Sequence, residues 1–138
     1  MLRKKGKHYL VFMVLACLSV ISSPLLAGEG FRDADVKEAA EMVAKEKNNA
    51  RFVILDVRTK GEYDKGHLFN SINIDIKSAN FGEEIGLLDR NKTYLVYCHS
   101  GKRSKRAQKK MKSMGFKNII NMKGGFTGWL GEKNPYQR

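Results

Sequence analysis

Apolar residues occur in short runs separated by polar stretches along most of the chain. Residues 52–55 and 94–97 are almost continuously apolar and rich in β-branched or aromatic residues, which is typical of strands buried on both faces of a sheet. Residues 118–121 predict another short strand. Isoleucines alternate with polar residues over 72–76, which predicts a half-exposed strand.

Two longer amphipathic stretches predict helices. Over residues 35–47 apolar residues recur at helical spacing, and Asp35 with Glu38 three positions later resembles a capping box. Residues 103–114 carry an apolar stripe of alanine and methionine, and Gly115 follows as a usual helix stop.

Shorter helices are expected over 79–88 and directly after Gly124-Gly125, and one helical turn over 62–65 within the polar loop 59–70. Strands therefore alternate with helices along the chain. This order predicts an α/β fold, a single domain with a mostly parallel central sheet and helices on both faces.

Residues 1–27 have the pattern of a secretory signal peptide. Bases without any acid occupy 1–9, an almost wholly apolar run spans 10–21, and the small Ala27 precedes Gly28. The apolar run is shorter than the ~20 residues that a membrane-spanning helix needs. We therefore expect cleavage after Ala27 and an exported protein, located in a bacterial periplasm.

Two other interpretations of the N-terminal segment stay open. An uncleaved segment would anchor the protein in a membrane. The small Ala16 before Cys17, inside the apolar run, also resembles a bacterial lipoprotein processing box. Cys17 would then carry lipid and hold the domain at a membrane, although residues 18–27 stay apolar where a lipoprotein tether is usually polar.

The composition is that of a globular protein. Of 138 residues, 42% are apolar and 29% are charged, which excludes disordered, collagen-like and disulfide-rich classes. The expected mature chain, 28–138, has 138 − 27 = 111 residues and a charge of 22 − 14 = +8, because four of the 26 bases are removed. A domain of this size buries roughly two thirds of its unfolded surface, enough for one core. Cys98 would be its only cysteine, so no internal disulfide can form.

Cys98, at the end of the strand over 94–97, is the main candidate for chemistry. Sites in open parallel sheets lie at the carboxyl ends of strands, and here a tight loop with Gly101 leads into a helix. Loop N–H groups, the helix N-terminus and the charges of Lys102 and Arg103 all stabilise an anion. We expect them to lower the pKa of Cys98 below the value of about 8.5 for a free thiol and to make it a nucleophilic thiolate. The alternative is a buried structural cysteine.

Four stretches, taken in order, resemble the single-domain rhodanese-like sulfurtransferases over roughly residues 34–131. They are residues 55–58 with Glu62-Tyr63 and Gly66-His67, residues 72–74, residues 97–104 with the active-site loop, and Gly124-Gly125 with Trp129. One departure is visible. Where the family usually has a proline two residues after the histidine, this chain has Phe69, which concerns substrate preference more than the fold.

The resemblance implies a sulfur-transfer reaction in two halves. The Cys98 thiolate takes the outer sulfur of a small anionic donor such as thiosulfate, and a thiophilic acceptor such as cyanide or a thiol then removes it from the Cys98 persulfide. No metal and no organic cofactor is implied. The resemblance also assigns roles: Arg103 holds the anionic donor, Asp56 and Arg58 brace the loop, and the backbone amides of the cradle belong to His99, Ser100, Gly101, Lys102 and Arg103.

The length of the loop separates this chemistry from that of cysteine-dependent phosphatases, some of which share the fold. Those enzymes place five residues between cysteine and arginine, whereas four separate Cys98 from Arg103. The smaller cradle fits a sulfur atom better than a tetrahedral phosphate.

Two histidines are further candidates for the site, and each has more than one interpretation. His67 is open to interpretation as a base or a metal ligand, but the further ligands that a zinc site needs are not found at suitable spacing, which favours a loop-bracing role. His99 either lowers the pKa of Cys98 through a positive charge or points to solvent.

Residues 102–112 carry seven bases, and no acid occurs between Arg90 and Gly131. Such a run is usually a solvated helix face, and beside the loop it also attracts anionic donors. Nucleic-acid binding is the other interpretation, but an exported chain seldom meets nucleic acid. The partners that the resemblance implies are a small anionic donor and a thiol acceptor, and a protein of a sulfur-transfer pathway is a further candidate. The alternative to an enzyme is a non-catalytic persulfide carrier loaded by another protein.

The N-terminus of the mature protein tests the interpretation of residues 1–27. Intact-mass measurement of the protein isolated from an exporting bacterium should give a chain that begins at Gly28. A chain that begins at a lipid-modified Cys17, or one that keeps Met1, would contradict cleavage after Ala27.

Overall fold

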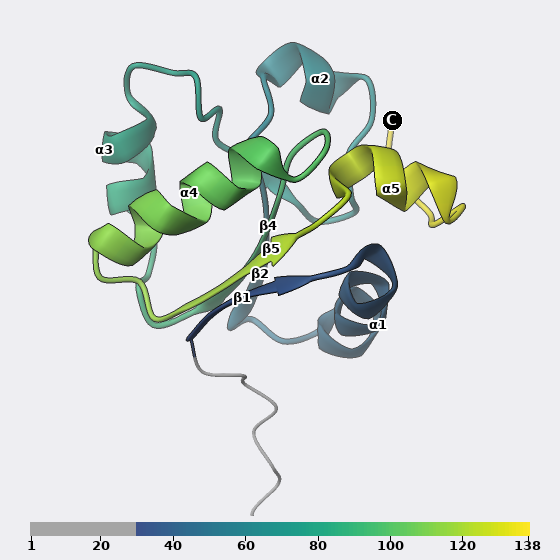
Figure 1. Cartoon of the computed structure of the whole chain (residues 1–138), viewed down its shortest axis with the longest axis horizontal. Helices are drawn as coiled ribbons and strands as arrows, with labels where there is room; N and C mark the ends of the chain where they lie inside the picture. The colour runs from purple at the N-terminus through teal and green to yellow at the C-terminus, as the bar shows by residue number, and fades with distance from the viewer. Residues whose placement is uncertain (1–29) are drawn as a thin grey trace, which may run out of the picture.

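Five parallel strands form one sheet in the order β1-β5-β4-β2-β3. In this computed structural model the described residues are 30–138, so the predicted signal peptide and Cys17 lie outside them. The strands are β1 (Gly30–Ala34), β2 (Phe52–Asp56), β3 (Ile72–Asn73), β4 (Thr93–Tyr97) and β5 (Asn118–Met122) (Figure 1). The predicted α/β fold with a parallel sheet is confirmed.

Helices cover both faces of this sheet, as predicted. They are α1 (Val36–Glu46), α2 (Lys60–Asp64), α3 (Phe81–Gly86), α4 (Lys102–Ser113) and α5 (Gly125–Gly131). In Figure 1, α3 and α4 lie on one side of the sheet and α1 lies on the other. Within residues 30–138, no helix has both the length and the apolar character needed to cross a membrane.

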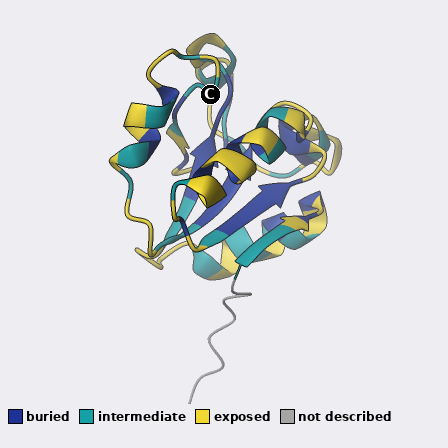
Figure 2. Ribbon diagram, turned by 60° about the vertical axis from the view of Figure 1, so that its left-hand side comes forward, coloured by how far each residue is buried: buried dark blue, intermediate teal, exposed yellow. Residues whose placement is uncertain are grey.

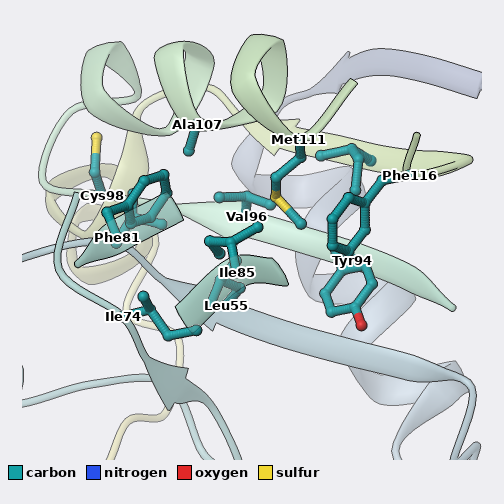
Figure 3. Packing of buried hydrophobic residues seen from close by; sticks show 12 residues of the cluster. Leu55, Ile74, Phe81, Ile85, Tyr94, Val96, Cys98, Ala107, Met111 and Phe116 are labelled. Atoms are coloured by element: carbon teal, nitrogen blue, oxygen red, sulfur yellow. The ribbon is translucent and has the colours of Figure 1, made fainter. Parts of the chain in front are cut away.

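The central strand β4 separates two apolar clusters, because successive side chains of a strand point to opposite faces. Tyr94 and Val96 belong to the cluster under α3 and α4, part of which Figure 3 shows. Leu95 and Tyr97 belong to the cluster under α1 and α5. All four side chains are buried, and each such burial contributes about 1.5–3 kcal/mol. Figure 2 shows the buried strands beneath helices whose outward faces are exposed.

The structure differs from the sequence predictions at both edges of the sheet. β1 was not predicted, because its sequence GFRDA has one aromatic residue among glycine and charges, as an edge strand can. The predicted strand over 72–76 is shorter, with only Ile72 and Asn73 in regular pairing. Beyond Asn73 the chain still donates hydrogen bonds from the amides of Ile74 and Ile76 to the end of β2 and the residue after it.

The long helices agree closely with the predictions. The Asp35 side chain caps α1 by accepting a hydrogen bond from the Glu38 amide at 2.8 Å. Beneath α4, the buried Gln108 donates two hydrogen bonds through Nε2, to the carbonyl oxygens of Arg32 at 2.7 Å and Ile119 at 2.9 Å. These bonds fix α4 over β1 and β5, and so set the position of its N-terminus.

Candidate active site

The candidate site lies where the connections of the sheet diverge. The chain leaves β2 toward β3 at one edge, whereas it leaves β4 toward β5 on the other side. The carboxyl ends of such a pair of strands flank the crevice where open parallel sheets bind ligands. Asp56 ends β2 and Cys98 directly follows β4, so the two polar clusters predicted from sequence meet at this edge.

The sulfur of Cys98 faces hydrogen-bond donors. The Gly101 amide donates to Sγ at 3.1 Å, and the Ser104 hydroxyl donates at 3.5 Å. Figure 3 shows the sulfur at the margin of the apolar cluster, pointing away from Phe81 and Ile74. The surroundings of the sulfur on the loop side are therefore polar, although only 1% of Cys98 is exposed.

Two opposing effects set the pKa of Cys98. Burial raises it, because the thiolate loses contact with water. Hydrogen bonds from the Ser104 hydroxyl and from the amides of Ser104, Ser100 and Gly101 stabilise the thiolate and lower it. The hydrogen bonds outweigh burial, so the pKa of Cys98 lies below its ordinary value.

The amides point inward because α5 holds the loop carbonyls. The Cys98 carbonyl accepts from the Phe126 amide at 2.7 Å, and the His99 carbonyl accepts from the Thr127 amide at 3.0 Å. A side chain at Gly125 cannot fit, since a Cβ there would lie 2.5 Å from the Cys98 carbonyl oxygen. Gly125 thus lets the first turn of α5 reach the loop. Gly101 has φ of 96°, a left-handed value that favours glycine and starts α4.

Arg103 is engaged in a bidentate ion pair. Its two terminal nitrogens donate to the two carboxylate oxygens of Glu62 in α2, each at 2.7 Å. Thr59 also donates to Glu62 from its amide and hydroxyl. The Arg103 hydrogen bond, with those from Thr59, lowers the pKa of Glu62 to about 2, so Glu62 is an anion at neutral pH. Its charge offsets that of Arg103 beside the loop. The predicted contact between Arg103 and a donor stays a prediction.

Asp56 and Arg58 form a buried ion pair beneath this region. Arg58 Nη2 donates to Asp56 Oδ2 at 2.6 Å and to the Gly66 carbonyl at 2.7 Å. The guanidinium carbon lies 4.2 Å from the ring centroid of Phe126 in α5. The pair therefore holds the ends of the segment that carries Glu62 and supports the helix that holds the Cys98 loop. Its hydrogen bonds are made within the pair and to the adjacent segment, and the predicted bracing of the Cys98 loop stays a prediction.

The histidines lie on either side of the site. The His67 ring stacks on Tyr63 with centroids 3.7 Å apart, and Nδ1 lies 2.9 Å from the Tyr63 carbonyl oxygen, which is a loop-bracing geometry. The exposed His99 places Nε2 3.2 Å from the Thr127 hydroxyl in α5. Within residues 30–138, no three His, Cys, Asp or Glu side chains are grouped so as to hold a metal ion.

Two residues of the site belong to the matched sequence motifs but were assigned no chemical role there. Ser104 is fully buried in the first turn of α4 and donates to the sulfur. Its signal is a small hydroxyl residue within a run of bases, one turn after the loop. Glu62 belongs to a capping box with Thr59 at α2, and that box is visible in the sequence. Its pairing with Arg103 joins residues 41 positions apart, which no local pattern reports.

A cysteine whose sulfur faces loop amides, at the carboxyl edge of a parallel sheet, is the central feature of this α/β domain. The family model of the rhodanese-like domain matches residues 35–132, and the chain belongs to this family. A rhodanese-related protein from Thermoplasma volcanium, known from its crystal structure, is 31% identical, with a TM-score of 0.66 over 77% of this chain and 97% of that one. The family and the fold predicted from sequence are confirmed.

Relatives of the same family carry names from sulfur metabolism. The putative sulfurtransferase YtwF of Bacillus subtilis is 32% identical over 103 residues, 73% of this chain and 97% of its own. The thiosulfate sulfurtransferase GlpE of Coxiella burnetii is 33% identical over 92 residues, 67% of this chain and 80% of its own.

Other relatives are longer proteins. The putative sulfur carrier protein YrkF of Bacillus subtilis is 37% identical over 79 residues, which are 57% of this chain and 42% of that protein. The chain spans only 28% of an adenylyltransferase and sulfurtransferase from Ogataea parapolymorpha. Relatives that share this domain are thus named both as sulfurtransferases and as sulfur carriers.

The hydrogen bond from Ser104 gives a testable prediction. Ser104→Ala should raise the pKa of Cys98 by about one unit, since a hydrogen bond to a charged group contributes at least about 1.4 kcal/mol. Alkylation by the neutral reagent iodoacetamide needs the thiolate, so its rate rises with pH. The midpoint of this rise should lie at a higher pH in the variant than in the wild type. Ser113→Ala, at the exposed far end of α4, is the matched control. An unchanged pH profile for Ser104→Ala would show that the Ser104 hydroxyl does not lower the pKa of Cys98.

Proposed function

We propose that the protein is a sulfurtransferase that moves sulfane sulfur from thiosulfate or a similar donor to a thiophilic acceptor through a Cys98 persulfide. The observation that carries the proposal is the direction of the donors around Sγ, with the Gly101 amide at 3.1 Å and the Ser104 hydroxyl at 3.5 Å. Both stabilise a sulfur anion, first the thiolate and then the persulfide.

The first half-reaction transfers one sulfur atom to the protein. The Cys98 thiolate attacks the outer sulfur of thiosulfate, and a sulfur–sulfur bond forms. The bond between the two thiosulfate sulfurs breaks, and its electron pair leaves with sulfite. In the second half-reaction an acceptor thiolate or cyanide attacks the outer persulfide sulfur, and the electron pair returns to Cys98 as thiolate. Charge and atoms balance without an external oxidant or reductant.

A persulfide carrier is the second candidate. The observation that favours it is the Arg103–Glu62 pair, because the carboxylate offsets the one cation expected to hold a free dianionic donor. In that case a partner protein loads Cys98, and turnover on thiosulfate is negligible.

Export is a separate proposal that rests on the sequence alone. We propose that residues 1–27 direct the protein to a bacterial periplasm and are then removed, with a retained anchor or a lipid-modified Cys17 as the alternatives. The same domain would then meet its sulfur donor outside the cytoplasm.

The role of Cys98 is tested by substitution. Cys98→Ser should abolish thiosulfate:cyanide sulfurtransferase turnover, because serine forms no persulfide, while circular dichroism shows an unchanged fold. Intact mass after incubation with thiosulfate should show one added sulfur atom in the wild type, and a thiol acceptor should remove it. Turnover by Cys98→Ser would refute the nucleophile. Wild-type protein that gains sulfur but does not turn over would identify the carrier.

The role of Arg103 needs a pair of variants, because Arg103→Ala also leaves the Glu62 carboxylate unpaired near the loop. We expect Arg103→Ala to lower kcat/KM at least about tenfold for thiosulfate, and less for an uncharged organic trisulfide. The double variant Arg103→Ala/Glu62→Gln removes the stranded charge and should stay impaired with thiosulfate if Arg103 binds the donor. Equal losses for both donors, or full recovery in the double variant, would contradict a donor contact.

A further inference from the structure

The outward face of α4 is a row of bases. Lys102, Arg106, Lys109 and Lys110 are all exposed, and we call these four residues the basic ridge. At 100° per residue they fall within about a 100° arc, opposite the buried Ala107 and Met111. Within residues 30–138, no carboxylate forms a salt bridge with any member of the ridge.

The other bases of α4 have structural contacts, in contrast to the ridge. Arg103 pairs with Glu62, and Lys105 pairs with Asp33 at 2.7 Å. Lys112 lies over the ring of Phe31, with Nζ 5.0 Å from the centroid. Among the bases of α4, the four of the ridge are the ones without such a contact to the rest of residues 30–138, and they are exposed from the first turn of the helix to the last.

The ridge opposes the stability of its own helix. Arg106 lies four residues from both Lys102 and Lys110, and like charges at this spacing destabilise a helix. Lys102 also lies in the first turn, where a cation is disfavoured by the helix dipole. Packing of the buried underside must offset these costs. Lys110 lies in the last turn, where the helix dipole favours a cation, so helix stability gives a reason for its charge but not for those of Lys102 and Arg106.

The length of the ridge exceeds what a small donor can use. Lys110 lies eight positions after Lys102, which is next to the loop, and this is about 12 Å along a helix. At physiological ionic strength charges are screened over about 8 Å. Lys109 and Lys110 therefore add little attraction for a thiosulfate ion at Cys98. A larger ligand that lies along α4 meets all four charges.

We propose that the basic ridge docks an acidic protein that donates sulfur to Cys98 or accepts it, with its thiol over the loop. The ridge starts at the first residue after Gly101, so a partner lying along α4 reaches the loop with one end. Lys123 is also exposed, and its Cα would lie 3.3 Å from a Cβ on Gly101, which puts a further base beside the loop. The identity of the reaction at the loop rests on the function proposed above, whereas the docking itself does not.

A protein partner fits these observations better than a nucleic acid. Single-stranded nucleic acids are bound by basic grooves combined with aromatic side chains on which bases stack. Residues 102–113 include no aromatic residue, and the ridge is convex. Under the function proposed above, Cys98 exchanges sulfur with a thiol or persulfide, which an acidic protein surface with an accessible cysteine provides.

Binding of two peptides tests the docking directly. One fluorescent peptide has a single cysteine followed by alternating glutamate and aspartate. The other keeps the cysteine and has serine and asparagine in place of the acidic residues. Fluorescence anisotropy with Cys98→Ser protein excludes covalent transfer from the measurement. We expect the acidic peptide to bind at least about tenfold more tightly than the neutral one, and the difference to shrink as salt is raised.

Matched charge reversals locate the binding. Lys109→Glu/Lys110→Glu should abolish the preference for the acidic peptide. Lys37→Glu/Lys45→Glu makes the same change of net charge on exposed residues of α1, across the sheet. This variant should keep most of the preference for the acidic peptide. Equal binding of both peptides, equal effects of the two reversals, or tighter ridge-dependent binding of a single-stranded RNA oligomer than of the acidic peptide would each overturn the proposal.

Sulfur transfer separates this proposal from the proposed function. In protein with Cys98 intact, Lys109→Glu/Lys110→Glu should lower kcat/KM for transfer to the acidic cysteine peptide about tenfold and leave turnover with thiosulfate and cyanide within about twofold. Loss of both activities together would contradict a ridge that acts on the partner alone. If no turnover is found but ridge-dependent peptide binding is retained, the proposed sulfurtransferase activity is refuted and the proposed docking surface is supported.

Discussion

The chemistry of this domain depends on how two backbone carbonyls are held. The carbonyls of Cys98 and His99 accept hydrogen bonds from the first turn of α5, which leaves the loop amides facing the sulfur. Gly125 makes this approach feasible, since a side chain there would collide with the Cys98 carbonyl. A nest of amides is a weak anion site unless its orientation is fixed beforehand, because reorientation would offset much of the gain.

Two ion pairs transmit that fixed geometry to the rest of the domain. The buried Asp56–Arg58 pair ties the end of β2 to Gly66 and supports Phe126 of α5. The more exposed Glu62–Arg103 pair ties α2 to the first turn of α4. Breaking a buried pair of the first kind costs about 3–5 kcal/mol, so the first pair is a structural constraint. The second is partly exposed and lies beside the Cys98 loop, where Arg103 is proposed to meet the donor.

The sequence predicts the centre of the fold and the loop better than the edges and the long-range pairs. β2 and β4 are buried on both faces, and their continuous apolar runs are read without structural information. β1 escapes this pattern because an edge strand needs few apolar residues. Cys98 and its glycine-containing loop were found from local order, since strand, loop and helix follow one another. The Arg103–Glu62 pair and the seating of α5 on the loop depend on three-dimensional contacts that no window of sequence contains.

The central claim is that hydrogen bonds from oriented amides and a hydroxyl lower the pKa of Cys98 by more than burial raises it. Titration of the native protein by the ultraviolet absorbance of the thiolate measures this balance, with Cys98→Ser as the blank and the same protein in denaturant as the reference. The account predicts a native pKa below the value of about 8.5 for a free thiol, rising toward that value on unfolding. A native pKa at or above the unfolded one would contradict it.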